Sequence, residues 1–181
     1  MQGTIALTSE RLRFRRYVSG DAEILYKDFG TDEKMFAYSG WNPYATREQA
    51  QATVDRFIAN YQDCHFYGWA IECGEALVGT VGAYDYDPEQ NSIEVGLSIK
   101  QAYWGRGYAG EALQTVLAYL TEQEGIRAVT AWCASENIGS KRVMEKCGMR
   151  RDGVERNALS INGHSFDKLN YTYRAEMKIS E

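Results

Sequence analysis

The stretch from Ile93 to Gly110 constrains the fold of this chain more than any other part of the sequence. Apolar residues occupy every second position from Ile93 to Ile99, which is the period of a strand with one buried face. From Ala109 to Leu120 apolar residues recur at the spacing of an amphipathic helix, and Gly125 is suited to a left-handed cap at its end. The stretch therefore predicts a strand that is followed closely by a helix.

Gly105, Arg106 and Gly107 lie between this strand and this helix. Glycine would let phosphate groups approach backbone N–H groups at the positive end of the helix dipole, although an ordinary turn also uses glycine for its dihedral angles. With Gly110 the glycines also satisfy G-x-G-x-x-G, the dinucleotide fingerprint, but Lys100–Trp104 separates them from the strand and no acidic residue follows at the expected distance. The loop therefore predicts anion binding, with nicotinamide dinucleotide binding as a weaker alternative.

Two motifs carry a resemblance to a known family. The run Trp104-Gly-Arg-Gly-Tyr-Ala109 resembles the pyrophosphate loop of the GNAT acetyltransferases, Q/R-x-x-G-x-G/A, and Asn137-Ile-Gly-Ser140 resembles part of their next motif. The chain departs from the family pattern at Trp104, although an aromatic residue there is usual in the most similar branch, which includes the ribosomal-protein N-terminal alanine acetyltransferases. The resemblance implies one acetyltransferase domain over residues 1–181 and acetyl-CoA as co-substrate.

The order of predicted elements indicates an α+β fold. A helix separates Ile93–Ile99 from Val129–Cys133, so these two strands are expected to be parallel. Short turns join the strands from Phe66 to Ile99 into a meander and join the last two strands to each other, so these are expected to be antiparallel. Helices are predicted at Ala22–Phe29, capped by Ser19, and after Thr46, which forms a capping box with Gln49. The resemblance implies a three-layer GNAT-like sandwich, with helices on both faces of a mixed, mostly antiparallel sheet and a splayed parallel strand pair. The other predicted strands are Leu12–Phe14, Phe66–Glu72, Ala76–Tyr86, Val154–Ile161 and Lys168–Met177.

The resemblance also implies how acetyl-CoA is held. The pantetheine arm is expected to lie in the cleft between the splayed strands. Asn137 is expected to bond a pantetheine amide or only to cap its helix, and Ser140 is expected near the thiolate. Many GNAT enzymes have a tyrosine acid where this chain has Met144. The backbone of Leu97, Ser98 and Ile99 is expected to bind pantetheine, and that of Trp104, Gly105, Arg106, Gly107, Tyr108 and Ala109 to bind the pyrophosphate.

Glu94 is the candidate general base, because an attacking amine must first lose a proton. It lies on the polar face of the predicted strand, shortly before the backbone expected to hold the cofactor. An apolar surround would raise its pKa toward neutrality. The alternative is a solvated carboxylate without a role, with Glu72 and Asp85 as substitutes. Aromatic neighbours are expected at Trp69, Tyr84 and Tyr86.

These residues predict an N-acetyltransferase that acts by direct transfer on a primary amine, either a protein N-terminus or a small molecule. Tyr38, Trp41 and Tyr44 cluster where the acceptor is expected, although aromatic residues packed beneath a loop would give the same pattern. Met144 leaves open a catalytically silent acyl-CoA-binding module. The glycine pattern leaves open, less strongly, an NAD-dependent oxidoreductase.

The composition limits the classes of partner and the cellular compartment that are expected for this protein. The net charge of −5 argues against a general nucleic-acid binder, and no apolar stretch has the length of a membrane span or signal peptide, so a cytoplasmic protein is expected. The four cysteines form no C-x-x-C pair, which predicts neither a metal site nor disulfides. Cys64 and His65 are expected to point to opposite faces of an extended segment. A monomer and a homodimer are both compatible with the sequence.

Overall fold

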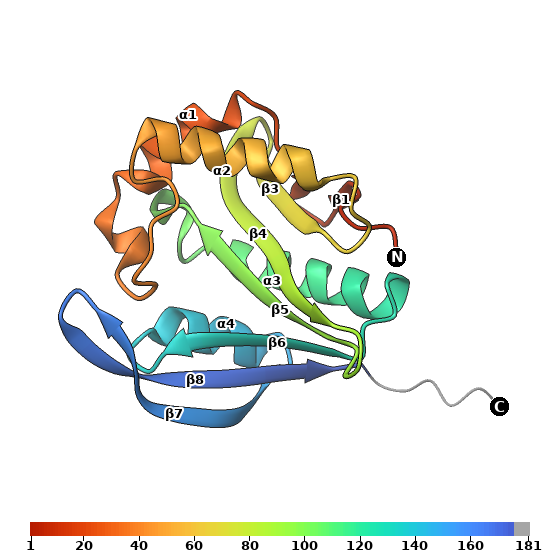
Figure 1. The fold of residues 1–181 in the computed structure, drawn as a ribbon, viewed down its shortest axis with the longest axis vertical. Coiled ribbons are helices and arrows are strands. Elements are labelled where there is room, and N and C mark those ends of the chain that lie inside the picture. The colour runs from red at the N-terminus through yellow and green to blue at the C-terminus, as the bar shows by residue number, and fades with distance from the viewer. Residues whose placement is uncertain (176–181) are drawn as a thin grey trace.

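The computed structural model describes residues 1–175, which form an eight-stranded mixed sheet with helices on both faces (Figure 1). The strand order is β1-β2-β3-β4-β5-β6-β8-β7. The strands are β1 (Leu7–Thr8), β2 (Arg13–Arg15), β3 (Tyr67–Cys73), β4 (Ala76–Asp87), β5 (Ser92–Ile99), β6 (Ala128–Ala134), β7 (Arg150–Ile161) and β8 (His164–Arg174). The helices are α1 (Asp21–Leu25), α2 (Arg47–Asn60), α3 (Tyr108–Ala118) and α4 (Ile138–Lys146).

The strands from β1 to β5 pair antiparallel in chain order, and β5 pairs parallel with β6 after the α3 crossover. Tight turns join two of the antiparallel pairs, β3 with β4 and β7 with β8, whereas the α1 and α2 segment connects β2 to β3. Gly74 between β3 and β4, and Asn162 and Gly163 between β7 and β8, have the positive φ angles that hairpin turns require. The predicted mixed sheet with one parallel pair is confirmed.

Two apolar layers lie on the two faces of the sheet. Trp69 on β3 packs edge-on against Tyr119, which continues α3 as a π-helical turn, in a core that also includes side chains of β4, β5 and α4. On the other face, Leu25, Phe29 and Val54 from the α1 and α2 segments form a second core. In Figure 1, α2 crosses in front of β3 and β4, and α3 lies behind the sheet.

Several helix and strand ends differ from the predictions. Ser19 does not cap α1, whose preceding residue Gly20 makes no side-chain cap, and the helix runs into a π-helical turn over Tyr26–Gly30. Thr46 does cap α2, because its hydroxyl accepts a hydrogen bond from the N–H of Gln49 at 3.2 Å. The last two strands begin earlier than predicted, and the predicted end at Met177 lies outside the described residues.

Candidate functional site

The parallel pair β5–β6 separates soon after it begins. Register pairs join Ser92–Glu94 only with Ala128–Thr130. Beyond Glu94, β5 stays paired with β4 as far as Ile99, while β6 stays paired with β8 as far as Ala134. The two strands therefore diverge, and the edge of β5 that includes Leu97–Ile99 is not paired with β6.

Glu94 lies at the point of divergence. It is the last residue of β5 in register with β6, and its side chain is half-buried. The indole N–H of Trp132 donates a hydrogen bond to Glu94 Oε1 at 3.1 Å. The carboxylate lines a cavity of about 380 Å³ whose wall continues through polar side chains of β6, β7 and β8. Among residues 1–175 no Lys or Arg forms an ion pair with Glu94.

The prediction of aromatic neighbours around Glu94 is only partly confirmed. Tyr84 is its cross-strand partner on β4, so these side chains share a face of the sheet. Trp69 is in register with Val81, on the opposite face, and its indole N–H donates to the carbonyl of Ile5 at 2.6 Å. The expectation for Trp69 was therefore wrong. Tyr86 follows a register shift after Tyr84 and stacks against His65.

The two substitutes for Glu94 have different surroundings. Glu72 accepts hydrogen bonds from the guanidinium groups of Arg13 and Arg15, with its closest ion pairs at 2.5 and 2.6 Å. Burial raises the pKa of Glu72, but these hydrogen bonds outweigh burial and leave the pKa below its ordinary value. Asp85 is exposed and lies at the irregularity that interrupts the β4–β5 pairing between Tyr84 and Asp87. Glu94 is therefore the carboxylate at the fork.

The glycine loop leads directly into α3. A 3₁₀ turn over Gln101–Tyr103 follows β5, and Gly105 and Gly107 have φ angles of 74° and 82°. A Cβ atom on Gly105 would meet no atom within 4 Å, so the loop backbone is open to an approaching group. No side chain caps the N-terminus of α3. The exposed loop and the uncapped helix end together fit a phosphate group.

Two side chains hold this loop in place: Trp104, whose backbone is in the predicted set, and Arg11, which is outside it. Trp104 turns back so that its indole N–H donates to the carbonyl of Ile99 at 2.5 Å. Arg11 donates to the carbonyl of Arg106 at 3.0 Å and pairs with Glu111 in the first turn of α3 at 2.7 Å. Burial raises the pKa of Glu111, but hydrogen bonds from Ser9 and Arg11 outweigh burial and leave the pKa below its ordinary value. Sequence analysis missed Arg11, because the alternation of its segment indicated only a strand.

The N-terminus of α4 is capped by a side chain. Asn137 Oδ1 accepts a hydrogen bond from the N–H of Ser140 at 3.1 Å, which confirms the capping role. Ser140 is half-buried in the first turn. Met144 is buried in the core, 5% exposed, and so brings no proton donor to the cleft. The contact of Asn137 with pantetheine and the role of Ser140 stay predictions.

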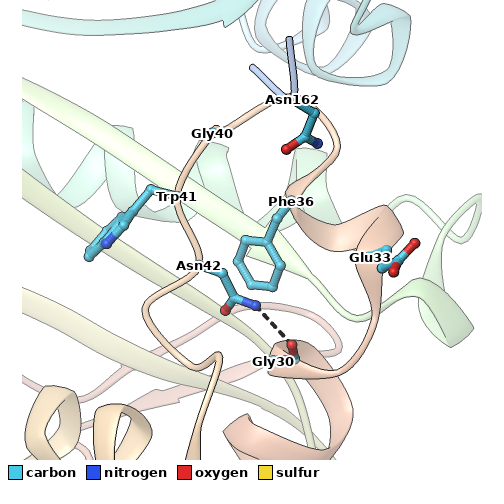
Figure 2. Close-up of a pocket in the computed structure, with 7 residues that line it drawn as sticks. All are labelled: Gly30, Glu33, Phe36, Gly40, Trp41, Asn42 and Asn162. Atoms are coloured by element: carbon cyan, nitrogen blue, oxygen red, sulfur yellow. Dashed lines mark hydrogen bonds between the residues drawn. The ribbon is translucent and has the colours of Figure 1, made fainter. Parts of the chain in front are cut away.

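A second cavity lies between the segment joining α1 to α2 and the tip of the β7–β8 hairpin (Figure 2). Its volume is about 420 Å³. Trp41 is 64% exposed, whereas Tyr44 is buried edge-on against Phe29 and Tyr38 packs edge-on against Phe166. Ordinary packing therefore accounts for Tyr44, and Trp41 is the aromatic of the three that lines the cavity. The lining residues are Gly30, Glu33, Phe36, Gly40, Trp41, Asn42 and Asn162.

The cysteines are all free. Cys133 is buried, and burial raises the pKa of its thiol to about 11. Cys64 is exposed, and its Sγ lies 3.5 Å from Nδ1 of His65. The expectation that these two side chains point apart was wrong, because they lie in a turn and not in an extended segment. Among residues 1–175, no helix is both long enough and apolar enough to cross a membrane.

Known proteins resemble this chain in fold and in sequence. Residues 11–150 match the family model of the acetyltransferase (GNAT) domain. The uncharacterized N-acetyltransferase YoaA of Bacillus subtilis is 29% identical over 168 residues, covering 92% of this chain and 94% of YoaA. The crystal structure of a GNAT-family acetyltransferase from Bacillus anthracis superimposes with a TM-score of 0.81 at 26% identity, covering 94% of this chain and 98% of that one.

A third comparison includes a bound ligand. RimL, a ribosomal L7/L12 alpha-N-protein acetyltransferase whose structure was solved with coenzyme A, superimposes with a TM-score of 0.84 at 19% identity, covering 92% of this chain and 95% of RimL. That likeness shows a shared fold. The splayed strands and the glycine loop at a helix N-terminus define an acyl-CoA-dependent acyltransferase. The chain belongs to the GNAT acetyltransferase family, which replaces the dinucleotide interpretation of its glycines.

Proposed function

We propose that this protein transfers the acetyl group of acetyl-CoA to a primary amine, by direct attack with Glu94 as general base. One observation carries the proposal. Glu94 lies where β5 and β6 diverge, and the open glycine loop follows the far end of β5. In this arrangement the thioester of a cofactor held by the loop would lie between the two strands, within reach of a carboxylate at their fork.

The cofactor is bound mainly by backbone groups. The amides from Trp104 to Ala109 hold the pyrophosphate at the uncapped end of α3, which the helix dipole makes favourable for negative charge. Leu97 and Ser98 offer the pantetheine arm the edge of β5 that is not paired with β6. The carbonyl of Ile99 already accepts the Trp104 indole N–H, so its contact with pantetheine would require that bond to be shared or exchanged. Asn137 adds a side-chain amide at the start of α4.

The reaction needs three proton and charge movements. Glu94 accepts a proton from the acceptor ammonium, and the neutral amine forms a C–N bond to the acetyl carbon. The C–S bond then breaks, the departing sulfur takes a proton from Ser140 or from water, and the second proton that the nitrogen loses on becoming an amide replaces it. Glu94 suits the first step because a neutral indole N–H holds it and no Lys or Arg of residues 1–175 lies within ion-pair distance of it.

The acceptor enters from the sheet face that carries Glu94. The cavity at Trp41 and Glu33 is our proposed acceptor subsite, because an exposed indole and a carboxylate suit an amine-bearing segment. RimL acts on a protein α-amino group, as its name states. A protein N-terminus and a small-molecule amine are the two acceptor classes to be compared.

Thermal unfolding with acetyl-CoA, with NAD as control, tests the cofactor first. A ligand at about 100 times its dissociation constant stabilises by about 2.7 kcal/mol, which raises Tm by roughly 5–10 °C for a chain of this length. We expect this rise with acetyl-CoA and not with NAD. The absence of a rise with acetyl-CoA would contradict the proposal.

Release of free coenzyme A from acetyl-CoA tests turnover. The acceptor panel contains peptides with free N-termini and small amines, and mass spectrometry identifies the acetylated product. A thiol reagent detects the released coenzyme A. Because exposed Cys64 would also react with this reagent, the assay uses a Cys64→Ser background. Acetyl-CoA binding without acetylation of any acceptor would favour the second candidate, a catalytically silent acyl-CoA-binding module, for which buried Met144 in place of a tyrosine acid is the supporting observation.

A further inference from the structure

We propose that Trp132 is a positioning residue for Glu94, an inference that rests on the proposed function. Glu94 is the last residue of β5 in register with β6, and its partner there is Thr130. Trp132 lies two positions further along β6, where the strands have begun to separate. The bond from Trp132 Nε1 to Glu94 Oε1, 3.1 Å long, therefore crosses the fork and fixes the carboxylate at the base of the cofactor cleft.

The indole is itself held from another strand. Lys168 on β8 places its ammonium 5.4 Å from the centroid of the Trp132 ring and lies 3.6 Å from the carboxylate of Glu155. The side chain of Trp132 is half-buried. Packing and a cation–π contact thus orient the ring so that its N–H points at Glu94.

A neutral donor suits a general base. An indole N–H occupies one acceptor site of the carboxylate, but it adds no positive charge that would hold the carboxylate ionised as an arginine does. Other titratable or charged groups face Glu94 as well. Tyr84 lies opposite on β4, Asp152 and Arg174 line the same cavity from β7 and β8, and Lys168 lies on the ring of Trp132.

The bond holds one oxygen of the Glu94 carboxylate in place, so its loss should leave the carboxylate less well oriented toward the acceptor ammonium. Trp132→Phe keeps most of the ring and removes the donor. We expect kcat to fall by roughly 2- to 10-fold because the carboxylate is less well held.

Indole N–H signals in ¹H–¹⁵N spectra test the bond without any acceptor. The Trp132 signal is the one that disappears in Trp132→Phe, and we expect it to shift with pH as Glu94 takes up a proton. In Glu94→Gln, which keeps an acceptor oxygen, that shift should vanish. Trp69 and Trp104 are internal controls, because their indoles donate to backbone carbonyls and should not titrate. A Trp132 signal with the same titration in Glu94→Gln would overturn the inference.

The rate measurements separate this inference from the proposed function. If Glu94→Gln leaves turnover unchanged at every pH, Glu94 is not the base and the proposed mechanism fails. If Glu94→Gln abolishes turnover but Trp132→Phe keeps kcat, only the positioning role fails. Acetyl-CoA affinity should be unchanged in both variants, and a loss of affinity in Trp132→Phe would instead indicate a cofactor contact.

Discussion

Glu72 and Glu94 lie in the same sheet, yet their surroundings give them different capacities. Glu72 is opposite Leu77 near the start of β4, and Glu94 is opposite Tyr84 near its end. Two arginines pair with Glu72, and Arg15 extends the network to Asp21 of α1 at 2.7 Å. Glu94 has a single neutral donor at the opening of a cleft. One carboxylate is committed to joining elements, while the other has no ion-pair partner among residues 1–175.

The contrast between Glu72 and Glu94 separates two kinds of position in this fold. We call the β5–β6 fork, with the N-termini of α3 and α4, the cleft region. Three residues of this region, Glu94, Gly107 and Asn137, have counterparts of similar chemistry outside it, namely Glu72, Gly125 and Thr46. Pairs of variants can therefore separate a role in the reaction from a role in stability.

Replacing Glu94 with Gln should have the largest effect. We expect turnover to fall by roughly 100-fold, the size expected for the loss of a general base, because glutamine cannot accept the ammonium proton. Acetyl-CoA affinity should stay nearly unchanged. Steady-state kinetics with any identified acceptor gives the first quantity, and calorimetric titration gives the second. Glu72→Gln is the control and should keep kcat, so an equal loss in both variants would end the distinction between the two carboxylates.

Replacing Gly107 with Val should weaken acetyl-CoA binding by at least about tenfold, which corresponds to about 1.4 kcal/mol. A Cβ atom at this position would meet Arg11 Nη2 at 3.4 Å, so a branched side chain would disturb the arginine that holds the loop at the start of α3. Gly125→Val is the matched control, since Gly125 also has a left-handed φ, 74°, and lies beyond the opposite end of the same helical segment. Both variants should lose stability from backbone strain. Undiminished affinity in Gly107→Val would place the phosphate site elsewhere.

Glu72→Gln should lower the free energy of unfolding by about 1–2 kcal/mol at pH 7, because it leaves two arginines without their charged partner. The pKa of Glu72 is lowered in the folded protein. Its contribution is therefore present above the pKa of the unfolded chain, about 4.3, and is lost as the pH falls through the folded value. Denaturant unfolding from pH 7 to pH 3 should show the gap between wild type and variant closing at acid pH. A gap that widens there would contradict this assignment.

The two helix caps provide the smallest contrast. Asn137→Ala and Thr46→Ala should each cost about 1 kcal/mol of stability, because each removes one side-chain acceptor from a helix N-terminus. Only Asn137→Ala should also weaken acetyl-CoA binding, by roughly 2- to 10-fold if its amide contacts pantetheine. Equal cofactor affinity in both variants would restrict Asn137 to capping.

Much of the cleft region could be predicted because its signals are local. The alternation of β5, the glycines of the loop and the cap at Asn137 each depend on residues within a few positions of one another. The crossover helix between β5 and β6 also determined that this pair is parallel. Ser19 failed as a cap because a capping signal states only which side chain is suitable, and the backbone around Gly20 takes a helical conformation instead.

The neighbours of Glu94 could not be predicted in the same way. Trp69 was expected beside it, but register places Trp69 opposite Val81 and so on the other face of the sheet. A shift of one residue in register exchanges the two faces of a strand, and no local pattern determines the shift between distant strands. The partner that Glu94 does have, Trp132, is 38 residues away along the chain.

The strand, loop and helix that we propose as the phosphate site, the order of the elements and the family resemblance could be read from the chain alone, because these depend on short-range periodicity and on residue chemistry. Which carboxylate has no ion-pair partner among residues 1–175 depends on tertiary packing. Arg13 and Arg15 come from β2, 57 to 59 residues from Glu72, and the indole beside Glu94 comes from across the fork. Whether a carboxylate acts as a base depends on the charges that packing brings to it, and packing joins residues that the sequence keeps apart.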